Sequence, residues 1–383
     1  MPAFERTEYQ RRVAGVAGVM QNREIDTLVV LSEANICYLT GYEGFSDYVP
    51  QAAIVCAGAA DAILILREMD LHCAYPTVYL DDDCIECYPE NCIGTPSRTP
   101  WEVIGARVKQ LNKGGRIGVE YGASVFSHRD HLALAAALDG ESVVDGSGVI
   151  ENIKRKKSAA EVVYMRQAAR IVDNALNKGI QQIAVGVREC DVAATIMHQL
   201  TCGTDGVGGG PTKPVTMGVG SRAAAPHLKW TDAPYVNGSQ TDFEVGAHVH
   251  RYVCPLSRTA YLGDPPQRLL DVHAGVLDGF LSAEAAIRPG ATCADVYNAF
   301  GQAFFPHGIR KESRIGYSIG IDWSDLCFSL QDDDFTELEP NYTFHLIIGI
   351  WEREDAYVFS EAFRVSDDGS ERLSNMPREL FIR

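Results

Sequence analysis

The sequence predicts an α/β protein with an α/β domain over residues 1–150 and an α+β domain over residues 151–383. Within the first 150 residues, short apolar runs alternate with segments of helical spacing, which is typical of a sheet covered by helices. After the charged segment 154–157, two pairs of predicted helices flank strand-like segments, and the chain ends in a strand-rich tail. A length of 383 residues leaves room for two domains of ordinary size.

The first domain is expected to form a small mixed sheet. Strands are predicted at 25–31, 52–56, 62–66 and 117–120, and helices at 101–111 and 131–138. The helix at 101–111 has helically spaced apolar residues and ends at the glycine pair Gly114 and Gly115.

The second domain begins with a strong helix signal at Ser158. Glu161 lies three residues after Ser158, which is the spacing of a capping box, and an apolar stripe continues to Leu176. Further helices are predicted at 189–200, 267–286 and 294–304. Residues 244–259, EVGAHVHRYVCPLSRT, read as a pair of strands at the centre of this domain.

Composition narrows the class of function. The formal net charge of −17, from 51 acidic and 34 basic residues, argues against nucleic-acid binding, which needs a basic surface. No apolar run is long enough to span a membrane, and the N-terminus lacks the apolar core of a signal peptide. We therefore expect a cytoplasmic protein whose eleven cysteines are thiols.

The central stretch 244–259 resembles the hairpin of the pita-bread hydrolases, the family of methionine and Xaa-Pro aminopeptidases and creatinase. The family pattern is an acidic residue, a glycine two residues later, a tyrosine, a second acidic residue and Arg-Thr. The matching residues here are Glu244, Gly246, Tyr252, Arg258 and Thr259. Pro255 occupies the second acidic slot, and a proline side chain cannot ligate a metal.

Three further segments carry the resemblance. Residues 225–227 (APH) are similar to the segment with the family's active-site histidine, here His227. Residues 316–320 (GYSIG) place Tyr317 in the slot of a metal-binding histidine. Residues 343–349 place Ile347 in the slot of a glutamate ligand, and Glu361 is matched to the final glutamate. The resemblance implies an N-terminal creatinase/prolidase-like domain and a C-terminal pita-bread catalytic domain.

The ligand slots predict that no metal and no other cofactor is bound. By this matching Glu244 and Glu361 keep carboxylates, whereas Pro255, Tyr317 and Ile347 replace the other three ligands. Two carboxylates are too few for a pair of hard divalent cations. The rival metal site is the pair His248 and His250, with Cys254 nearby, which would suit zinc but has no predicted supporting residues.

Among metal-free relatives, the sequence is more similar to the ectoine hydrolases than to creatinase, which has a glutamate where Ser257 stands. The similar segments are 38–42 (YLTGY), 48–51 (YVPQ), 225–232 (APHLKWTD), 252–259 (YVCPLSRT), 314–320 (RIGYSIG) and 343–346 (TFHL). The departures are His248, His250 and the short connection at Asp322 and Trp323. The resemblance implies a homodimer that opens the ring of ectoine or 5-hydroxyectoine to N-acetyl-diaminobutyrate, and hence a C–N hydrolase that does not cut peptides.

His227, Glu244 and Glu361 are the expected catalytic residues. One carboxylate can pair with a cationic amidine, the other can attack its carbon or orient water, and the histidine can return a proton to the leaving nitrogen. Each residue also has a structural interpretation: a loop histidine with satisfied hydrogen bonds for His227, a solvated acid for Glu244, and a buried ion pair with Arg258 or Arg364 for Glu361.

The expected substrate is a small cationic amidine that also bears a carboxylate. Tyr317 and His345 would contact it from one sheet face, and Arg314 would bind the carboxylate with its planar guanidinium. Tyr42, Phe45 and Tyr48 would supply an aromatic wall for a cationic ring. The structural alternative is that these aromatic residues belong to the core and that Arg314 forms a surface ion pair.

Three other functions remain open at this point. The first is a creatinase-like amidinohydrolase that acts on another small amidine or guanidine. The second is a metal-dependent Xaa-Pro peptidase-like enzyme that recruits its metal through the histidines. The third is a binding protein without turnover, which the joint presence of His227, Glu244 and Glu361 disfavours.

Overall fold

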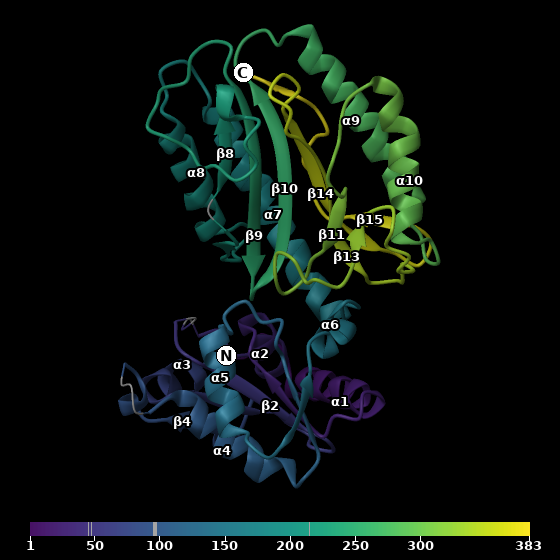
Figure 1. The fold of residues 1–383 in the computed structure, drawn as a ribbon. Coiled ribbons are helices and arrows are strands. Elements are labelled where there is room, and N and C mark those ends of the chain that lie inside the picture. The colour runs from purple at the N-terminus through teal and green to yellow at the C-terminus, as the bar shows by residue number, and fades with distance from the viewer. Residues whose placement is uncertain (45, 47, 95–97, 214) are drawn as a thin grey trace. The chain divides into compact units, whose positions relative to one another are not determined.

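The computed structural model describes residues 1–383 except 45, 47, 95–97 and 214, and the chain divides into two compact units. The N-terminal unit is Met1–Lys154 and the C-terminal unit is Arg155–Arg383 (Figure 1). No helix within the described residues is both long enough and apolar enough to cross a membrane.

The N-terminal unit is built on a mixed sheet with the strand order β4-β3-β2-β1-β5-β6 among the described residues. Its strands are β1 (Thr27–Val30), β2 (Ala52–Cys56), β3 (Ile63–Arg67), β4 (Ile85–Tyr88), β5 (Arg116–Val119) and β6 (Ser142–Asp145). Its helices are α1 (Arg6–Asn22), α2 (Glu33–Thr40), α3 (Leu71–Ala74), α4 (Pro100–Asn112), α5 (His128–Ala137) and α6 (Val149–Lys154). The four strands and two helices expected here from the sequence are confirmed within a few residues, whereas β4, β6, α1, α2, α3 and α6 were not predicted.

The core of this unit forms where α4 and α5 cover the sheet. Trp101 and Ile104 of α4 and Leu134 of α5 belong to one buried cluster with Val29 of β1 and Ile117 of β5. β1 is the central strand because it pairs antiparallel with β2 and parallel with β5. A strand buried on both faces reads as a continuous apolar run, which is why the sequence reveals it.

The C-terminal unit contains a larger sheet, ten-stranded among the described residues, with the main order β12-β11-β13-β14-β10-β9-β7. Its strands are β7 (Gly210–Pro211), β8 (Thr216–Val219), β9 (Gln240–Val249), β10 (Tyr252–Tyr261), β11 (Gly316–Ser318), β12 (Ser329–Leu330), β13 (Thr343–Ile350), β14 (Tyr357–Val365), β15 (Ser370–Arg372) and β16 (Phe381–Ile382). β8 pairs with β9, β15 with β14, and β16 with β10.

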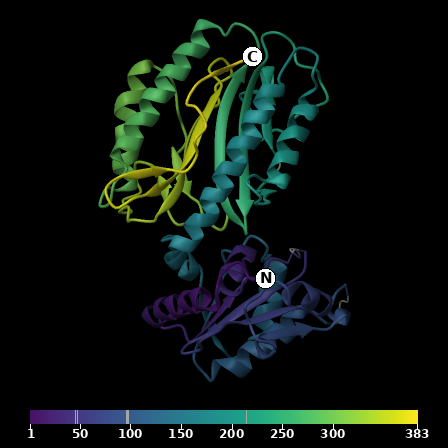
Figure 2. The same ribbon diagram turned by 180° about the vertical axis from the view of Figure 1, so that it is seen from behind.

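Two helix pairs lie along this sheet, α7 with α8 and α9 with α10 (Figures 1 and 2). Their bounds are α7 (Ala159–Gln182), α8 (Glu189–Cys202), α9 (Gln267–Ala286) and α10 (Cys293–Phe304). α7 crosses β9 and β10, and α9 contacts β13 and β14. The predicted capping box is confirmed, because Ser158 and Glu161 exchange both side-chain hydrogen bonds at the start of α7.

The hairpin of β9 and β10 determines which side chains share a face of the sheet. Glu244 lies opposite Ser257, and Gly246 lies opposite Pro255. Ser257 in turn lies opposite Ser360 of β14. Directly paired residues point to the same face, so Glu244, Ser257 and Ser360 form one row across three strands.

The other face of the sheet carries the aromatic core beneath α9 and α10. Phe359 and Phe363 of β14 pack in one buried cluster with Phe280 of α9 and Phe300 of α10. The rings of Phe280 and Phe359 meet edge to face, with centroids 4.8 Å apart. Because side chains alternate along a strand, Glu361 shares this helix-covered face with Phe359 and Phe363.

Candidate active site

A cavity of about 90 Å³ in the C-terminal unit gathers several of the residues expected from the sequence. The lining residues are Thr212, Lys213, Thr216, His227, Glu244, Gly246, Tyr317 and Trp323. His227, Glu244 and Tyr317 therefore come together from three segments far apart in the sequence. Lys213 and Trp323 also line the cavity, although neither was chosen from the sequence.

Glu244 lies in the middle of β9, between Thr216 of β8 and Ser257 of β10. Its side chain is half-buried, and burial raises the pKa of its carboxyl to about 7, against the opposing charge of Lys213. A carboxyl group with a pKa near neutrality can both hold and release a proton at physiological pH. Glu244 is thus suited to acid–base chemistry or to pairing with a cation.

Residues on both sides of His227 bond to Glu189, the first residue of α8. Arg222 pairs with a carboxylate oxygen of Glu189, and the Thr231 backbone N–H donates to the other oxygen at 2.6 Å. The Thr231 hydroxyl also donates to Glu189, at 2.9 Å. These contacts hold the loop in place, while the side chain of His227 stays exposed and lines the cavity beside Glu244.

Tyr317 is held by a chain of hydrogen bonds that continues into the buried sheet. Trp323 Nε1 donates to the Tyr317 hydroxyl at 2.8 Å, and His345 Nδ1 lies 3.1 Å from the same oxygen. His345 Nε2 lies 2.6 Å from Ser360 Oγ. Burial lowers the pKa of His345 to about 3, so its imidazole is neutral near pH 7. His345 supports Tyr317 from behind and is not among the residues that line the cavity.

Arg314 stands outside this cavity. Its side chain is exposed, its Nη1 donates to Ser329 Oγ at 2.7 Å, and its guanidinium lies 4.6 Å from the centroid of the Tyr317 ring. The structure thus places Arg314 against Tyr317 but not among the residues that line the cavity with Glu244.

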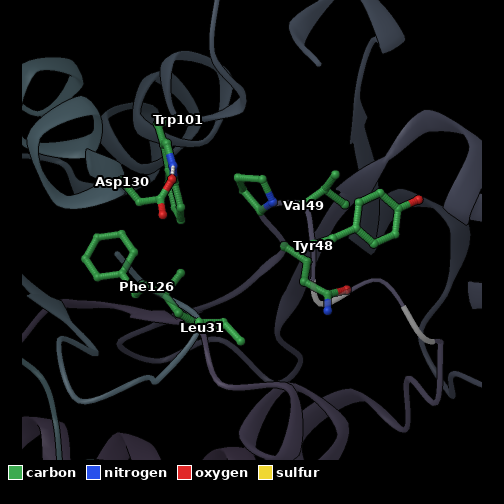
Figure 3. Close-up of a pocket in the computed structure, with 9 residues that line it drawn as sticks. Leu31, Tyr48, Val49, Trp101, Phe126 and Asp130 are labelled. Carbon is green, nitrogen blue, oxygen red and sulfur yellow. Dashed lines mark hydrogen bonds between the residues drawn. The ribbon is translucent and has the colours of Figure 1, made fainter. Parts of the chain in front are cut away.

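The three aromatic candidates belong to the N-terminal unit, where Tyr42 is buried. Phe45 lies outside the described residues. Tyr48 is 69% exposed and accepts a hydrogen bond from Arg67 Nη1 at 3.0 Å. It borders a separate cavity with Val49 and Trp101, where Trp101 Nε1 donates to Asp130 Oδ1 at 2.8 Å (Figure 3).

Glu361 differs most from the sequence-based expectation. Its side chain is fully buried and lies on the helix-covered face, so it does not meet Glu244 and His227 in the cavity. Arg258 and Arg372 pair with its Oε1 at 2.7 and 2.6 Å, and Arg378 pairs with its Oε2 at 2.7 Å. The buried ion pair with Arg258, which the sequence left open as the structural interpretation, is present.

Ser360, one residue earlier, is the β14 side chain that faces the candidate site. A one-residue shift in assignment along a strand moves a side chain to the opposite face. Ser360 contacts His345 and lies in the row with Glu244 and Ser257, whose buried hydroxyl has no hydrogen-bond partner among the described residues. The alternation of Phe359 and Phe363 around Glu361 was the sequence signal that could have shown this.

Comparisons with known proteins show the family to which the chain belongs. Residues 163–370 match metallopeptidase family M24, and residues 12–154 match the creatinase/prolidase N-terminal domain. The chain belongs to metallopeptidase family M24.

Two similar proteins span almost the whole chain. An uncharacterized hydrolase/peptidase of Sinorhizobium fredii, y4tL, is 37% identical over 99% of this chain and 97% of its own length. Ectoine hydrolase of Halomonas elongata is 32% identical over 99% of this chain and 98% of its own length.

Solved structures confirm the predicted fold class, a creatinase/prolidase-like N-terminal domain followed by a pita-bread domain. The prolidase of Thermococcus sibiricus superposes with a TM-score of 0.86 at 19% identity, covering 98% of this chain and 99% of that protein. Dipeptidase PepE of Mycobacterium ulcerans gives a TM-score of 0.83 at 20% identity, covering 99% of both chains.

The family name implies a metal, and the donor set of this chain does not fit one. Among the described residues, no group of three or more His, Cys, Asp or Glu side chains is placed to hold a metal ion. Glu244 is the one carboxylate among the described residues that line the cavity, and Glu361 is engaged by arginines on the opposite face. A di-metal site needs several oxygen or imidazole ligands around each cation.

We predict that Glu361→Gln mainly destabilises the fold. Removing one partner of a buried ion pair leaves uncompensated charge and costs about 3–5 kcal/mol of unfolding free energy. The control is Glu339→Gln, whose exposed pair with Lys156 should contribute less than about 1 kcal/mol. Urea unfolding measures both, and unchanged stability of Glu361→Gln would contradict the assignment.

We predict that Gly246→Ala disrupts the cavity wall. An added Cβ would meet Trp323 Cζ3 at 2.3 Å and Thr212 Oγ1 at 2.5 Å, and overpacking of this kind costs about 1–3 kcal/mol. At Gly208 an added Cβ meets nothing within 4 Å, so Gly208→Ala should be neutral or slightly stabilising. Equal thermal and urea stability of the two variants would show that Trp323 does not pack against Gly246.

Proposed function

We propose that this protein is a metal-independent hydrolase that opens the cyclic amidine of ectoine or 5-hydroxyectoine to an N-acetyl-diaminobutyrate. The observation that carries the proposal is that Glu244 and His227 line the same small cavity, which has no second carboxylate among its described lining residues. The similarity to an ectoine hydrolase over almost the full length supports the choice of substrate.

Glu244 interacts with the substrate in its ionised form. One carboxylate oxygen accepts a hydrogen bond from the amidinium N–H, because charge-assisted pairs of this kind are strong. The other oxygen takes a proton from the water that adds to the amidinium carbon. The product of this step is a tetrahedral adduct in which the carbon carries the new hydroxyl and both ring nitrogens.

His227 completes the reaction. It donates a proton to one ring nitrogen, and the bond from that nitrogen to the central carbon breaks. The hydroxyl of the adduct becomes the carbonyl of an amide, and its proton passes to the released amine, which leaves as an ammonium. The proton held by Glu244 returns to solvent or to His227, so the sum of the steps is the addition of one water. Tyr317 lines the same cavity, and its hydroxyl is bonded to Trp323 and His345. In this proposal the hydroxyl orients the reacting ring.

Two arguments support metal independence, the lack of a fitting set of metal donors among the described residues and the charge of the substrate. A substrate that already carries a positive charge on the reacting carbon does not need a Lewis acid to become electrophilic. The proposed enzyme is a homodimer. The resemblance to the metal-free relatives implies that the N-terminal domain of one subunit covers the active site of the other.

Purified protein incubated with ectoine, 5-hydroxyectoine, creatine and an Xaa-Pro dipeptide tests the substrate class. The expected result is that ectoine or its hydroxy derivative gains the mass of one water, as read by mass spectrometry, while creatine and the dipeptide are unchanged. Hydrolysis of creatine alone would support the creatinase-like alternative, and cleavage of the dipeptide only with added manganese would support a peptidase.

We predict that the pH profile of kcat/KM reports Glu244. Because burial raises its pKa to about 7, the ionised form is lost as pH falls, and kcat/KM should drop about tenfold per pH unit below that value. Glu244→Gln should lower kcat by about 100-fold or more and abolish this acidic limb. Glu339→Gln is the exposed control, and undiminished turnover in Glu244→Gln would remove Glu244 from the mechanism.

A further inference from the structure

Lys213 places a positive charge in the same cavity as Glu244. It lies in the connection between β7 and β8, and its ammonium is 5.2 Å from the centroid of the Trp323 ring. Among the described residues, no carboxylate lies within salt-bridge distance of Lys213. A lysine that lines a cavity beside a catalytic carboxylate, yet is not paired with it, has an ammonium free to bind a ligand anion.

We propose that Lys213 is the subsite for the substrate's carboxylate, and that Glu244 and Lys213 together select a small zwitterion. This inference rests on the proposed function and names the part of the substrate that each charge recognises. Glu244 takes the amidinium end and Lys213 takes the carboxylate end of the same molecule. From the sequence alone, the residue expected to bind the substrate's carboxylate is Arg314.

The Trp323 ring, which lies against the Lys213 ammonium, is held in place by hydrogen bonds, and this gives the ammonium a defined position. Trp323 is largely buried, its Nε1 donates to the Tyr317 hydroxyl at 2.8 Å, and its backbone N–H donates to Asp322 Oδ1 at 2.7 Å. A cation over an indole face gains about 0.5–1 kcal/mol at an exposed site, and the stacking leaves the charge un-neutralised. The lysine can therefore bind a carboxylate while it rests on the ring.

Two opposite charges that line one cavity favour a ligand that carries both signs. Lys213 and Glu244 are close enough to interact, since Lys213 opposes the rise in the pKa of Glu244, but they form no salt bridge. A ligand with charges at both ends can neutralise both residues at once. A cation without a carboxylate would meet Glu244 but would be repelled by Lys213.

Arg314 is the rival for this role, and its surroundings disfavour it. Its guanidinium stacks on the ring of Tyr317 and bonds to Ser329, and it is not among the residues that line the cavity. Lys213 lines the cavity directly. A lysine ammonium binds as a point charge and does not require the planar bidentate geometry of a guanidinium.

The test compares two substrates that differ only in the carboxylate. Ectoine and 2-methyl-1,4,5,6-tetrahydropyrimidine, the same ring without the acid group, are each assayed for KM and kcat. The proteins are the wild type, Lys213→Met, Lys213→Arg, Arg314→Met and the control Lys156→Met, an exposed lysine that pairs only with exposed Glu339 among the described residues. Thermal melting verifies that each variant is folded.

For Lys213→Met we expect the KM for ectoine to rise about 10- to 100-fold, the cost of losing a hydrogen bond to a charged group, with a smaller change in kcat. The KM for the decarboxylated ring should stay the same or fall, because a repelling charge is removed. Lys213→Arg should restore part of the affinity, and Lys156→Met should match the wild type.

Two results would overturn the Lys213 subsite while leaving the proposed function intact. One is that wild type opens ectoine but Lys213→Met affects both substrates equally or neither. The other is that the carboxylate-dependent loss appears in Arg314→Met instead. If the wild type opens neither ring, the proposed function itself fails, and the subsite fails with it.

Discussion

The pairing of β9 with β10 is the constraint on which the candidate active site depends. Its register sets Glu244 opposite Ser257 and Gly246 opposite Pro255, and the contact of β10 with β14 extends the same row to Ser360. Every residue along these strands is thereby committed to one of two faces. A shift of one residue in this hairpin would exchange the faces and dismantle the cavity.

The two faces of the sheet differ in how their carboxylates are paired. On the helix-covered face, Arg258 and Glu361 are both fully buried and satisfy each other, with Arg372 and Arg378 completing the shell around the carboxylate. On the cavity face, Glu244 has no such arginine partner among the described residues, and burial raises its pKa to about 7. The carboxylate of Glu361 is thus neutralised within the protein, and the carboxylate of Glu244 lines the cavity.

Much of the fold could be predicted because local signals agree with it. The capping box at Ser158 and Glu161 marked the start of α7, and the helix predicted at 267–286 coincides with α9. The grouping of His227, Glu244 and Tyr317 also followed from motif order. These features depend on short stretches of sequence, or on a resemblance that spans the chain.

Other parts of the site depend on tertiary geometry that local sequence does not carry. Glu361 and Ser360 are neighbours in the chain, and only the register of β14 decides which faces the cavity. Lys213 lies between two strands and not within one, so the alternation of side chains along a strand does not predict where its side chain points. The choice between Lys213 and Arg314 required the cavity itself, because both are basic residues close to matched motifs.

The central claim is that a cavity with a single lining carboxylate among the described residues handles a cationic substrate without a metal ion. The most direct measurement is the rate of ectoine opening by enzyme stripped with a chelator, with the metal content of the same sample determined by mass spectrometry. The account predicts an unchanged rate with far less than one metal per chain. Loss of activity on stripping, restored together with stoichiometric manganese, cobalt or zinc, would contradict it.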